Sequence, residues 1–237
     1  GNYDAKGGND VLYADLSAAT TAIEFVAGSG VTYSYLGSTF SNFERYLVST
    51  GSGNDFIDTR GAAALDDHLV MGAGNDTVYA GGGNDYIEGG LGNDSLDGGT
   101  GNDTVYGGDG NDSISLMADG IDVVDGGSGI DSLIVDLGEL NHRGNGRIWW
   151  LERNTEGQVI AFAGAESTFS MIDTYVKTAT TNTLIVQDDY NGGGSFASVT
   201  FNNIESLSVT TSTATNNNDD LIFLRGVGNY DAKGGND

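Results

Sequence analysis

The chain has 237 residues, with 34 acidic residues against nine basic ones and a formal net charge of −25, which repels nucleic acid and anionic membranes and attracts cations. It has no Cys, which excludes disulfides and thiolate metal sites, and no apolar run near the about 20 residues of a membrane helix. A hydrophobic content of 38% excludes a disordered linker, and 39 glycines with no proline leave the turns to Gly, Asn and Asp.

The first segment, residues 1–17, is expected to be the end of a repetitive roll. Its KGGNDVLYADL, which carries Asp10, is similar to GSGIDSLIVDL around Asp131, because both run D-x-L-x-x-D-L. Its first ten residues, GNYDAKGGND, return unchanged at 228–237. We therefore interpret the chain as one period of a tandem array, in which the closing segment, 212–237, starts the next roll.

A short β insertion is expected over residues 18–50. It ends in FSNFERYLVST at 40–50, which is similar to FNNIESLSVTT at 201–211. Both sequences, called here the return motifs, lead back into roll-like sequence: DFIDTRG at 55–61 and DLIFLRG at 220–226.

The central segment, residues 51–134, is dominated by units of about nine residues. In each of the units between 71 and 134, an Asp follows a Gly by two positions and precedes an aliphatic residue by two. These Asp residues are Asp76, Asp85, Asp94, Asp103, Asp112, Asp122 and Asp131. A flexible glycine-rich linker would not keep an apolar residue in register, so the units indicate structure.

Glycine supports tight turns, and the three residues after each Asp fit a short strand whose middle side chain points inward. If two units make one coil, alternate units stack in a parallel sheet about 4.8 Å apart. Asp85 would then lie above Asp103, and Asp76 above Asp94 and Asp112.

Such a stack is not expected to form from the polypeptide alone. Each unit buries one aliphatic side chain, worth roughly 1.5–3 kcal/mol, whereas ordering each residue costs about 1–2 kcal/mol. Stacked carboxylates about 5 Å apart repel by roughly 3–4 kcal/mol per pair. A divalent cation reverses that repulsion. Calcium fits best, since it takes 6–8 oxygens in flexible geometry, whereas Mg²⁺ needs a strict octahedron and Zn²⁺ prefers His or Cys.

These units resemble the nonapeptide G-G-x-G-x-D-x-U-x of the RTX (repeats-in-toxin, hemolysin-type calcium-binding) family. The resemblance implies a parallel β-roll, several bound Ca²⁺ ions, secretion from a Gram-negative bacterium by a one-step route, and folding on external calcium. It also implies that the ligands are each Asp side chain and the carbonyls two and four residues before it. Those carbonyls belong to Gly72, Gly74, Gly81, Gly83, Gly90, Gly92, Gly99, Gly101, Gly108, Gly110, Gly120, Gly127 and Gly129.

Three further Asp residues, Asp10, Asp55 and Asp67, are candidate ligands outside the regular run. The unit of Asp122 departs from the pattern, because one residue is inserted and Ala118 and Asp119 stand where glycine is expected.

A longer β insertion is expected over residues 135–211. RIWWLER, QVIAFAG, NTLIVQDD and FASVTF are short, rich in β-branched and aromatic residues and bounded by turn formers, as strands are. IDTYVKT at 172–178 is the one weak helical candidate. Antiparallel strands, as a small sandwich or a sheet, would cover the open edges at the end of the roll.

A tryptophan pair in the long insertion is a candidate sugar-binding site, although a structural role explains it equally well. Trp149 and Trp150, near His142, Arg143 and Arg147, suit a sugar platform, but strand alternation would equally place one Trp inward and one on the surface.

Further residues are expected to be structural. His68 is expected to face solvent, and Arg60 and Arg225 to neutralise nearby Asp or cap the roll. No carboxylate pair stands out from the lattice as a glycosidase pair, and Ser-His-Asp, Rossmann, P-loop and EF-hand signatures are absent.

The sequence thus predicts an all-β protein: a calcium-binding parallel β-roll, or solenoid, with flanking β-rich insertion modules. Three functions fit. The first is a non-enzymatic structural repeat of a large secreted or cell-surface protein (adhesin, stalk or surface layer), with adjacent copies of itself as partners. The second is the folding and secretion module of a toxin or hydrolase. The third is a lectin-like unit that binds a surface glycan.

Overall fold

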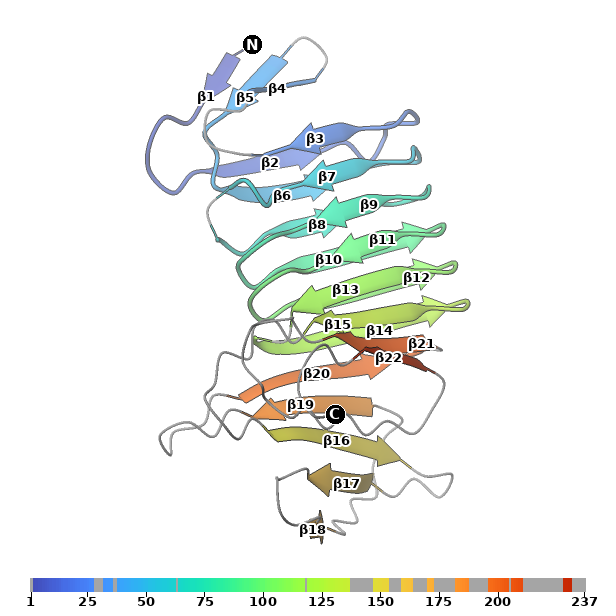
Figure 1. Ribbon diagram of the computed structural model, residues 1–237. Coiled ribbons are helices and arrows are strands. Elements are labelled where there is room, and N and C mark those ends of the chain that lie inside the picture. The colour runs from blue at the N-terminus through green and yellow to red at the C-terminus, as the bar shows by residue number, and fades with distance from the viewer. Residues whose placement is uncertain are drawn as a thin grey trace.

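The computed structural model of the protein is all-β in its described part, which comprises residues 2–27, 32–35, 38–62, 64–117, 119–136, 147–153, 159–163, 170–172, 182–187, 196–204, 206–210 and 228–231. No helix in these ranges is long and apolar enough to cross a membrane. The chain winds as a stack of coils, each giving one strand to each of two sheets (Figure 1). The all-β, parallel roll predicted above is therefore confirmed.

The first sheet has eleven strands, and its roll portion is parallel. The roll strands are β2 (Val11–Asp15), β6 (Arg45–Ser49), β8 (His68–Val70), β10 (Tyr86–Leu91), β12 (Thr104–Asp109), β14 (Ile121–Ser128) and β20 (Phe196–Asn202).

The second sheet has eight strands, and every pairing in it is parallel. Its strands are β3 (Glu24–Val26), β7 (Phe56–Asp58), β9 (Thr77–Tyr79), β11 (Ser95–Asp97), β13 (Ser113–Met117), β15 (Ser132–Asp136), β21 (Ser206–Thr210) and β22 (Gly228–Asp231). Strand β3 lies in the roll although its residues fall within the segment assigned to the short insertion.

Two nine-residue units make one coil, as predicted. Ile87 of β10 lies level with Val105 of β12, and Leu96 of β11 lies level with Ile114 of β13. Both pairs are 18 residues apart, so the same position of alternate units stacks in each sheet.

The core is a double column of aliphatic side chains, one from the middle of each strand. Burial alternates along the strands, and the aliphatic residue two after each repeat Asp is 0–1% exposed at Val78, Ile87, Leu96, Val105, Ile114, Val124 and Leu133. The register that the sequence keeps is therefore the register of the core.

Replacing one of these residues should create a cavity in the buried column. We expect Leu96→Ala, at a site 1% exposed, to lower the free energy of unfolding by about 2–5 kcal/mol. Leu91→Ala, at a site 55% exposed, should change it by less than about 0.5 kcal/mol. Chemical denaturation in saturating calcium checks the pair, and equal losses would contradict the inward assignment of Leu96.

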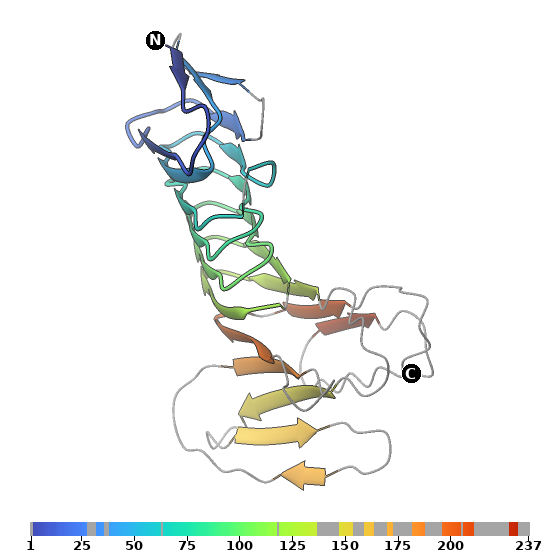
Figure 2. The ribbon, with the colours of Figure 1, turned by 90° about the vertical axis from the view of Figure 1, so that its left-hand side faces the viewer.

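Beyond β20 the first sheet continues in antiparallel fashion through β19 (Asn182–Gln187), β16 (Arg147–Arg153), β17 (Val159–Ala163) and β18 (Ser170–Ile172). Figure 2 shows these strands extending the stack at its C-terminal end. The described strands of the long insertion thus extend the first sheet at its edge, so they form a sheet and not a sandwich. Of the helical candidate at 172–178, only Ile172 is described, and it ends β18.

The other end of the stack carries a small sheet of β1 (Asn2–Asp4), β5 (Ser38–Ser41) and β4 (Thr32–Tyr35) (Figure 1). Strand β1 runs parallel to β5, and β4 runs antiparallel to it.

Candidate metal-binding turns

The repeat Asp residues form two columns, one in each row of turns. In both columns the backbone N–H of one Asp donates to Oδ1 of the Asp one coil further on, at 2.7–3.0 Å. One column holds Asp55, Asp76, Asp94, Asp112 and Asp131, and the other holds Asp67, Asp85, Asp103 and Asp122. The predicted stacking of these side chains is confirmed.

The second carboxylate oxygen of these residues has a different environment. Within the described residues, Oδ2 is buried and has no hydrogen-bond partner at Asp10, Asp55, Asp76, Asp85, Asp94, Asp103, Asp112 and Asp122. A buried charged oxygen without a partner is costly. Its recurrence in coil after coil indicates that something outside the polypeptide satisfies it.

The glycines that precede each Asp give the turns their shape. Those two and four positions earlier have positive φ throughout the regular units, from 87° at Gly99 to 149° at Gly129. A Cβ at Gly92 would lie 1.7 Å from the carbonyl oxygen of Gly74, one coil away. The carbonyls that the family resemblance implies as ligands thus lie at the contact between successive turns.

Some of these carbonyls also hydrogen-bond within the roll. The oxygen of Gly72 accepts from the Leu91 N–H at 2.8 Å, and that of Gly81 accepts from the Thr100 N–H at 2.8 Å. A carbonyl oxygen has two lone pairs, so this bond leaves one for a cation.

The first glycine of G-G-x-G-x-D makes room beside the unsatisfied oxygen, a role that sequence reasoning missed. A Cβ at Gly89 would lie 2.4 Å from Oδ2 of Asp94, and one at Gly107 would lie 2.4 Å from Oδ2 of Asp112. The doubled glycine of the motif was the available signal, because only the second of the two is needed for the positive-φ turn.

Sequence reasoning also missed an asparagine ladder next to each Asp column. Asn75 Oδ1 accepts the N–H of Asn93 at 2.7 Å, and Asn93 Oδ1 accepts that of Asn111 at 2.7 Å. In the other row, Oδ1 of Asp66 accepts the N–H of Asn84, and Oδ1 of Asn84 accepts the N–H of Asn102. The Asn of each G-N-D therefore provides the hydrogen-bond acceptor for an exposed backbone N–H of the next turn, while the neighbouring Asp faces inward.

The unit of Asp122 keeps its place in the column but changes its turn. Gly120 is not among the positive-φ glycines, and the N–H of Gly101 bonds to the carboxylate of Asp119 at 3.0 Å. In the regular units the equivalent Gly83 N–H bonds to the carbonyl of Thr100. The side chain of Asp119 thus replaces a backbone carbonyl where the extra residue is inserted.

The turn of Asp10 has the shape of a regular unit despite its different sequence. Lys6 has φ of 71° and Gly8 has φ of 147°, at the positions four and two before Asp10. The N–H of Asp10 donates at 2.8 Å to the carboxylate of Glu44, which belongs to the first return motif. Glu44 therefore takes the place of the next Asp in the column.

Burial changes the acidity of the columns. Desolvation raises the pKa of Asp76, Asp85 and Asp122 to about 7, although a backbone hydrogen bond to each opposes the shift. The same cause raises the pKa of Asp67, Asp103 and Asp112 to about 6. Neighbouring carboxylates of the column add to the rise at Asp76 and Asp85. Without a cation, these carboxylates of the folded roll must therefore either take up protons at neutral pH or remain as unfavourable buried charges.

This predicts an unusual pH dependence in chelator. The pKa of each of these Asp side chains is higher in the folded chain than the unfolded value of 3.8. Each side chain therefore favours the fold most below pH 3.8, where it is protonated, and this contribution is lost as the pH rises toward 6–7. We expect roll content, measured by circular dichroism in EDTA, to rise from pH 8 to pH 5. In calcium titrations, the midpoint should shift to higher concentration at pH 5, since protons compete for the ligands. A chelated chain whose roll content is unchanged or lower at pH 5 would contradict the burial of these charges.

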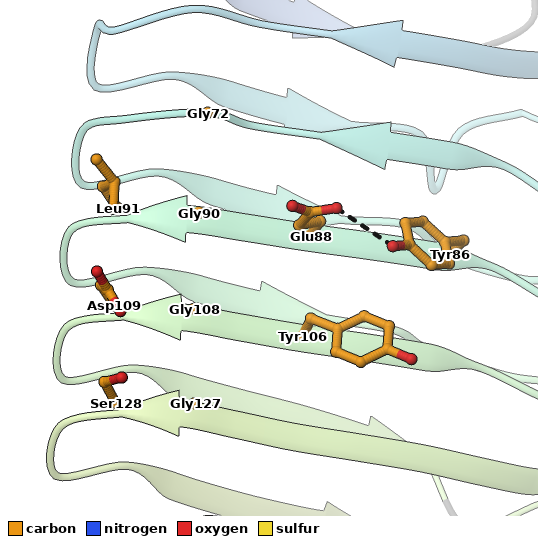
Figure 3. A pocket seen from close by; sticks show the side chains of 10 residues that line it. All are labelled: Gly72, Tyr86, Glu88, Gly90, Leu91, Tyr106, Gly108, Asp109, Gly127 and Ser128. Carbon is orange, nitrogen blue, oxygen red and sulfur yellow. Dashed lines mark hydrogen bonds between the residues drawn. The ribbon is translucent and has the colours of Figure 1, made fainter.

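A shallow groove runs over the outer face of the first sheet (Figure 3). The glycine column of Gly72, Gly90, Gly108 and Gly127 forms its floor. Its sides are Tyr86, Glu88, Leu91, Tyr106, Asp109 and Ser128, with the Tyr86 hydroxyl 3.2 Å from Glu88. The groove follows from the absence of side chains along the turn glycines.

Two of the remaining sequence predictions can be checked. His68 is exposed, as expected, and stacks on Tyr86 with ring centroids 4.4 Å apart. Arg60 forms an ion pair with Asp58 at 2.7 Å and lies 3.9 Å from the centre of the Tyr79 ring, which confirms its neutralising role. Strand β16 contains Trp149 and Trp150, but the placement of their side chains lies outside what is described, as do His142, Arg143 and Arg225.

The donor set fits calcium better than a metal held by side chains alone. Within the described ranges, no three His, Cys, Asp or Glu side chains gather as a metal site. A cation between the turns would have to combine a carboxylate oxygen with backbone carbonyls, which is a ligand set typical of Ca²⁺. The residues present therefore fit calcium, which would neutralise the columns and join successive coils.

Comparison with known proteins agrees with this geometry. The family model of the RTX calcium-binding nonapeptide repeat, which describes four copies, matches residues 64–96 and 89–117. No curated protein and no solved structure matches the chain.

The chain thus carries RTX repeats, which bind several calcium ions per array. This repeat is a structural calcium-binding module, not a catalytic one, and it occurs in extracellular proteins secreted by Gram-negative bacteria.

Proposed function

We propose that this chain is a calcium-folded spacer of a large surface protein, such as an adhesin, a stalk or a surface layer, and that it recurs there in tandem. The observation that carries the proposal is the column of buried Oδ2 atoms without partners, repeated in both rows of turns. In this role calcium completes a rigid rod outside the cell, and the chain needs no other ligand.

The ligands we propose are the repeat Asp carboxylates and the carbonyls two and four residues before them. Asp76, Asp85, Asp94, Asp103 and Asp112 lie in regular turns with both glycines in the left-handed region. Asp122 lacks that turn, and Asp67 is preceded by Leu65 and Ala63 where the glycines would stand, so their sites should be the weakest.

The energetics suit a switch at the cell surface. Each ion that binds only the folded chain stabilises it by about 2.7 kcal/mol at a calcium concentration 100 times its Kd. Several ions together exceed the stability of about 5–15 kcal/mol that is usual for a domain. Low cytosolic calcium would leave the chain unfolded and suited to export, and millimolar external calcium would fold it.

The repeated decapeptide favours a tandem spacer over the alternative, a single folding and secretion module of a toxin or hydrolase. Such a module would have no reason to repeat its first ten residues after 227. A parent gene with many copies would support the spacer, and one copy behind a catalytic domain would support the alternative.

The calcium-dependent part of the proposal is tested by circular dichroism of the purified chain in EDTA and during calcium titration. We expect an unfolded spectrum in chelator at pH 7.5 and a cooperative rise in β signal with calcium, with Mg²⁺ ineffective at equal concentration. A chain equally folded in chelator would contradict the proposal.

A further inference from the structure

The two ends of the roll are built in the same way. At one end β14 pairs in parallel with β20, so that Val124 lies level with Phe201 and Asp125 with Asn202. At the other end β1 pairs in parallel with β5, so that Tyr3 lies level with Phe40. In both cases an antiparallel strand, β19 or β4, then covers the outer edge.

The hydrogen bonds that fix these corners are also the same. Asn42 and Asn203 both have positive φ, 58° and 49°. The side-chain amide of Asn42 donates to Oδ1 of Asp4 at 2.7 Å, and that of Asn203 donates to Oδ1 of Asp125 at 2.7 Å. Strand β1 therefore occupies the place of a full roll strand such as β14.

Strand β1 nevertheless lacks the neighbour that β14 has. Strand β14 lies between β12 and β20, whereas β1 is the terminal strand of its sheet, and no described strand pairs with its second edge. The Ala5 N–H donates to the carbonyl of Ser41, so the backbone groups of Asn2 and Asp4 face the second edge. Tyr3, in the register of the fully buried Val124, is 55% exposed.

The copy of this strand at the other end of the chain uses the opposite edge. Strand β22 has the sequence of β1 and pairs in parallel with β21, with Tyr230 level with Val209. Strand β21 precedes β22 in the stack, whereas β5 follows β1. The same sequence thus pairs with β21, which precedes it, at one end of the chain, and with β5, which follows it, at the other end.

We propose that GNYDAKGGND forms one strand shared by successive copies of this chain, paired with β21 of the preceding copy on one edge and with β5 of the following copy on the other. This rests on the tandem arrangement proposed above and names its partner surface. The second sheet of one copy would run without a break through β22 into β5 and β4 of the next copy.

Sharing the strand removes two exposed sheet edges and covers Tyr3. Unpaired edges invite aggregation, so their pairing is favourable. It also gives the array a continuous sheet from one copy into the next.

A two-copy protein, residues 1–227 followed by the complete chain, tests this with engineered disulfides. The natural chain has no Cys, so only the engineered cysteines can pair, and peptide mapping identifies which of them do. One pair, Ser208→Cys with Asn229→Cys, joins the shared strand to β21 of the first copy. The other, Asp231→Cys with Ser41→Cys of the second copy, joins it to β5, since Asp231 is the Asp4 of that copy.

Level residues of paired strands lie within disulfide reach. In calcium we expect both disulfides to form in the same molecule, seen by peptide mass mapping. The matched comparison uses two proteins that carry only the second pair, because Thr39 of the second copy lies level with Asn229. Moving the Ser41 cysteine to Thr39, two residues out of register with Asp231, should lower the yield of the disulfide at least tenfold. Both proteins lose the Asp4 side chain, so its loss cancels.

The possible failures are distinct. If calcium induces β structure but the Asp231–Ser41 disulfide forms no better than the control, the shared strand is wrong and calcium-dependent folding stands. If calcium induces no β structure in this protein, the proposed function fails.

Discussion

Gly92→Ala should destabilise the centre of the roll. Gly92 has φ of 127°, and a Cβ there would lie 1.7 Å from the carbonyl oxygen of Gly74 and 2.6 Å from its carbon. Backbone atoms of a coil held on both sides cannot move away without breaking the strand register. A side chain at positive φ costs about 1–2 kcal/mol and overpacking about 1–3 kcal/mol, so we expect a loss of about 2–5 kcal/mol.

The matched control is Gly7→Ala, because a Cβ at Gly7 meets nothing within 4 Å. It should change stability by less than about 1 kcal/mol. Thermal unfolding in saturating calcium separates the two variants. If Gly92→Ala unfolds at the temperature of the parent protein, successive turns do not approach as closely as the structure shows.

Asp94→Asn should weaken calcium-dependent folding but stabilise the fold when calcium is removed. Asn keeps an oxygen that can accept the N–H of Asp76, now at 2.8 Å, but it removes a buried charge. In calcium this removes a carboxylate ligand. Since 1.4 kcal/mol corresponds to a factor of ten, and a full ion–ion contact is worth more, the calcium midpoint should rise at least about tenfold.

In chelator the same variant should be more stable than the parent protein. Burial raises the pKa of Asp94, so the charged form opposes folding when no cation is present. Asp109→Asn is the control, because Asp109 is exposed on the rim of the groove and lies outside the columns. Calcium titrations followed by circular dichroism give the first reading. Roll content in EDTA, followed by circular dichroism as the pH is lowered from 8 to 5, gives the second. A variant that is destabilised equally in calcium and in chelator would indicate that Asp94 acts only as a hydrogen-bond acceptor.

The sequence alone predicted the features that depend on periodicity. The spacing of nine, with an aliphatic residue two after each Asp, gave the two-unit coil, the core column and the stacking of Asp85 on Asp103. RIWWLER became β16 unchanged, because a short run of aromatic and β-branched residues has few alternatives to a strand.

Other features depend on contacts between coils and left little trace in the sequence. Glu44 replaces an Asp of the column through a hydrogen bond to a residue 34 positions earlier. The asparagine ladder and the space beside Oδ2 at Gly89 depend on the vertical register, which composition does not reveal. Strand β3 joins the roll because the Ile23 N–H bonds to Asp55, across a return motif that the sequence presents as a boundary.

The central claim is that cations between the turns hold the Asp columns together. The most direct measurement is a high-resolution crystal structure of the chain grown in millimolar calcium, with anomalous scattering to identify the ions. We expect an ion between successive turns next to Oδ2 of Asp85, Asp94 and Asp103. Well-ordered turns without metal in those crystals would contradict the account.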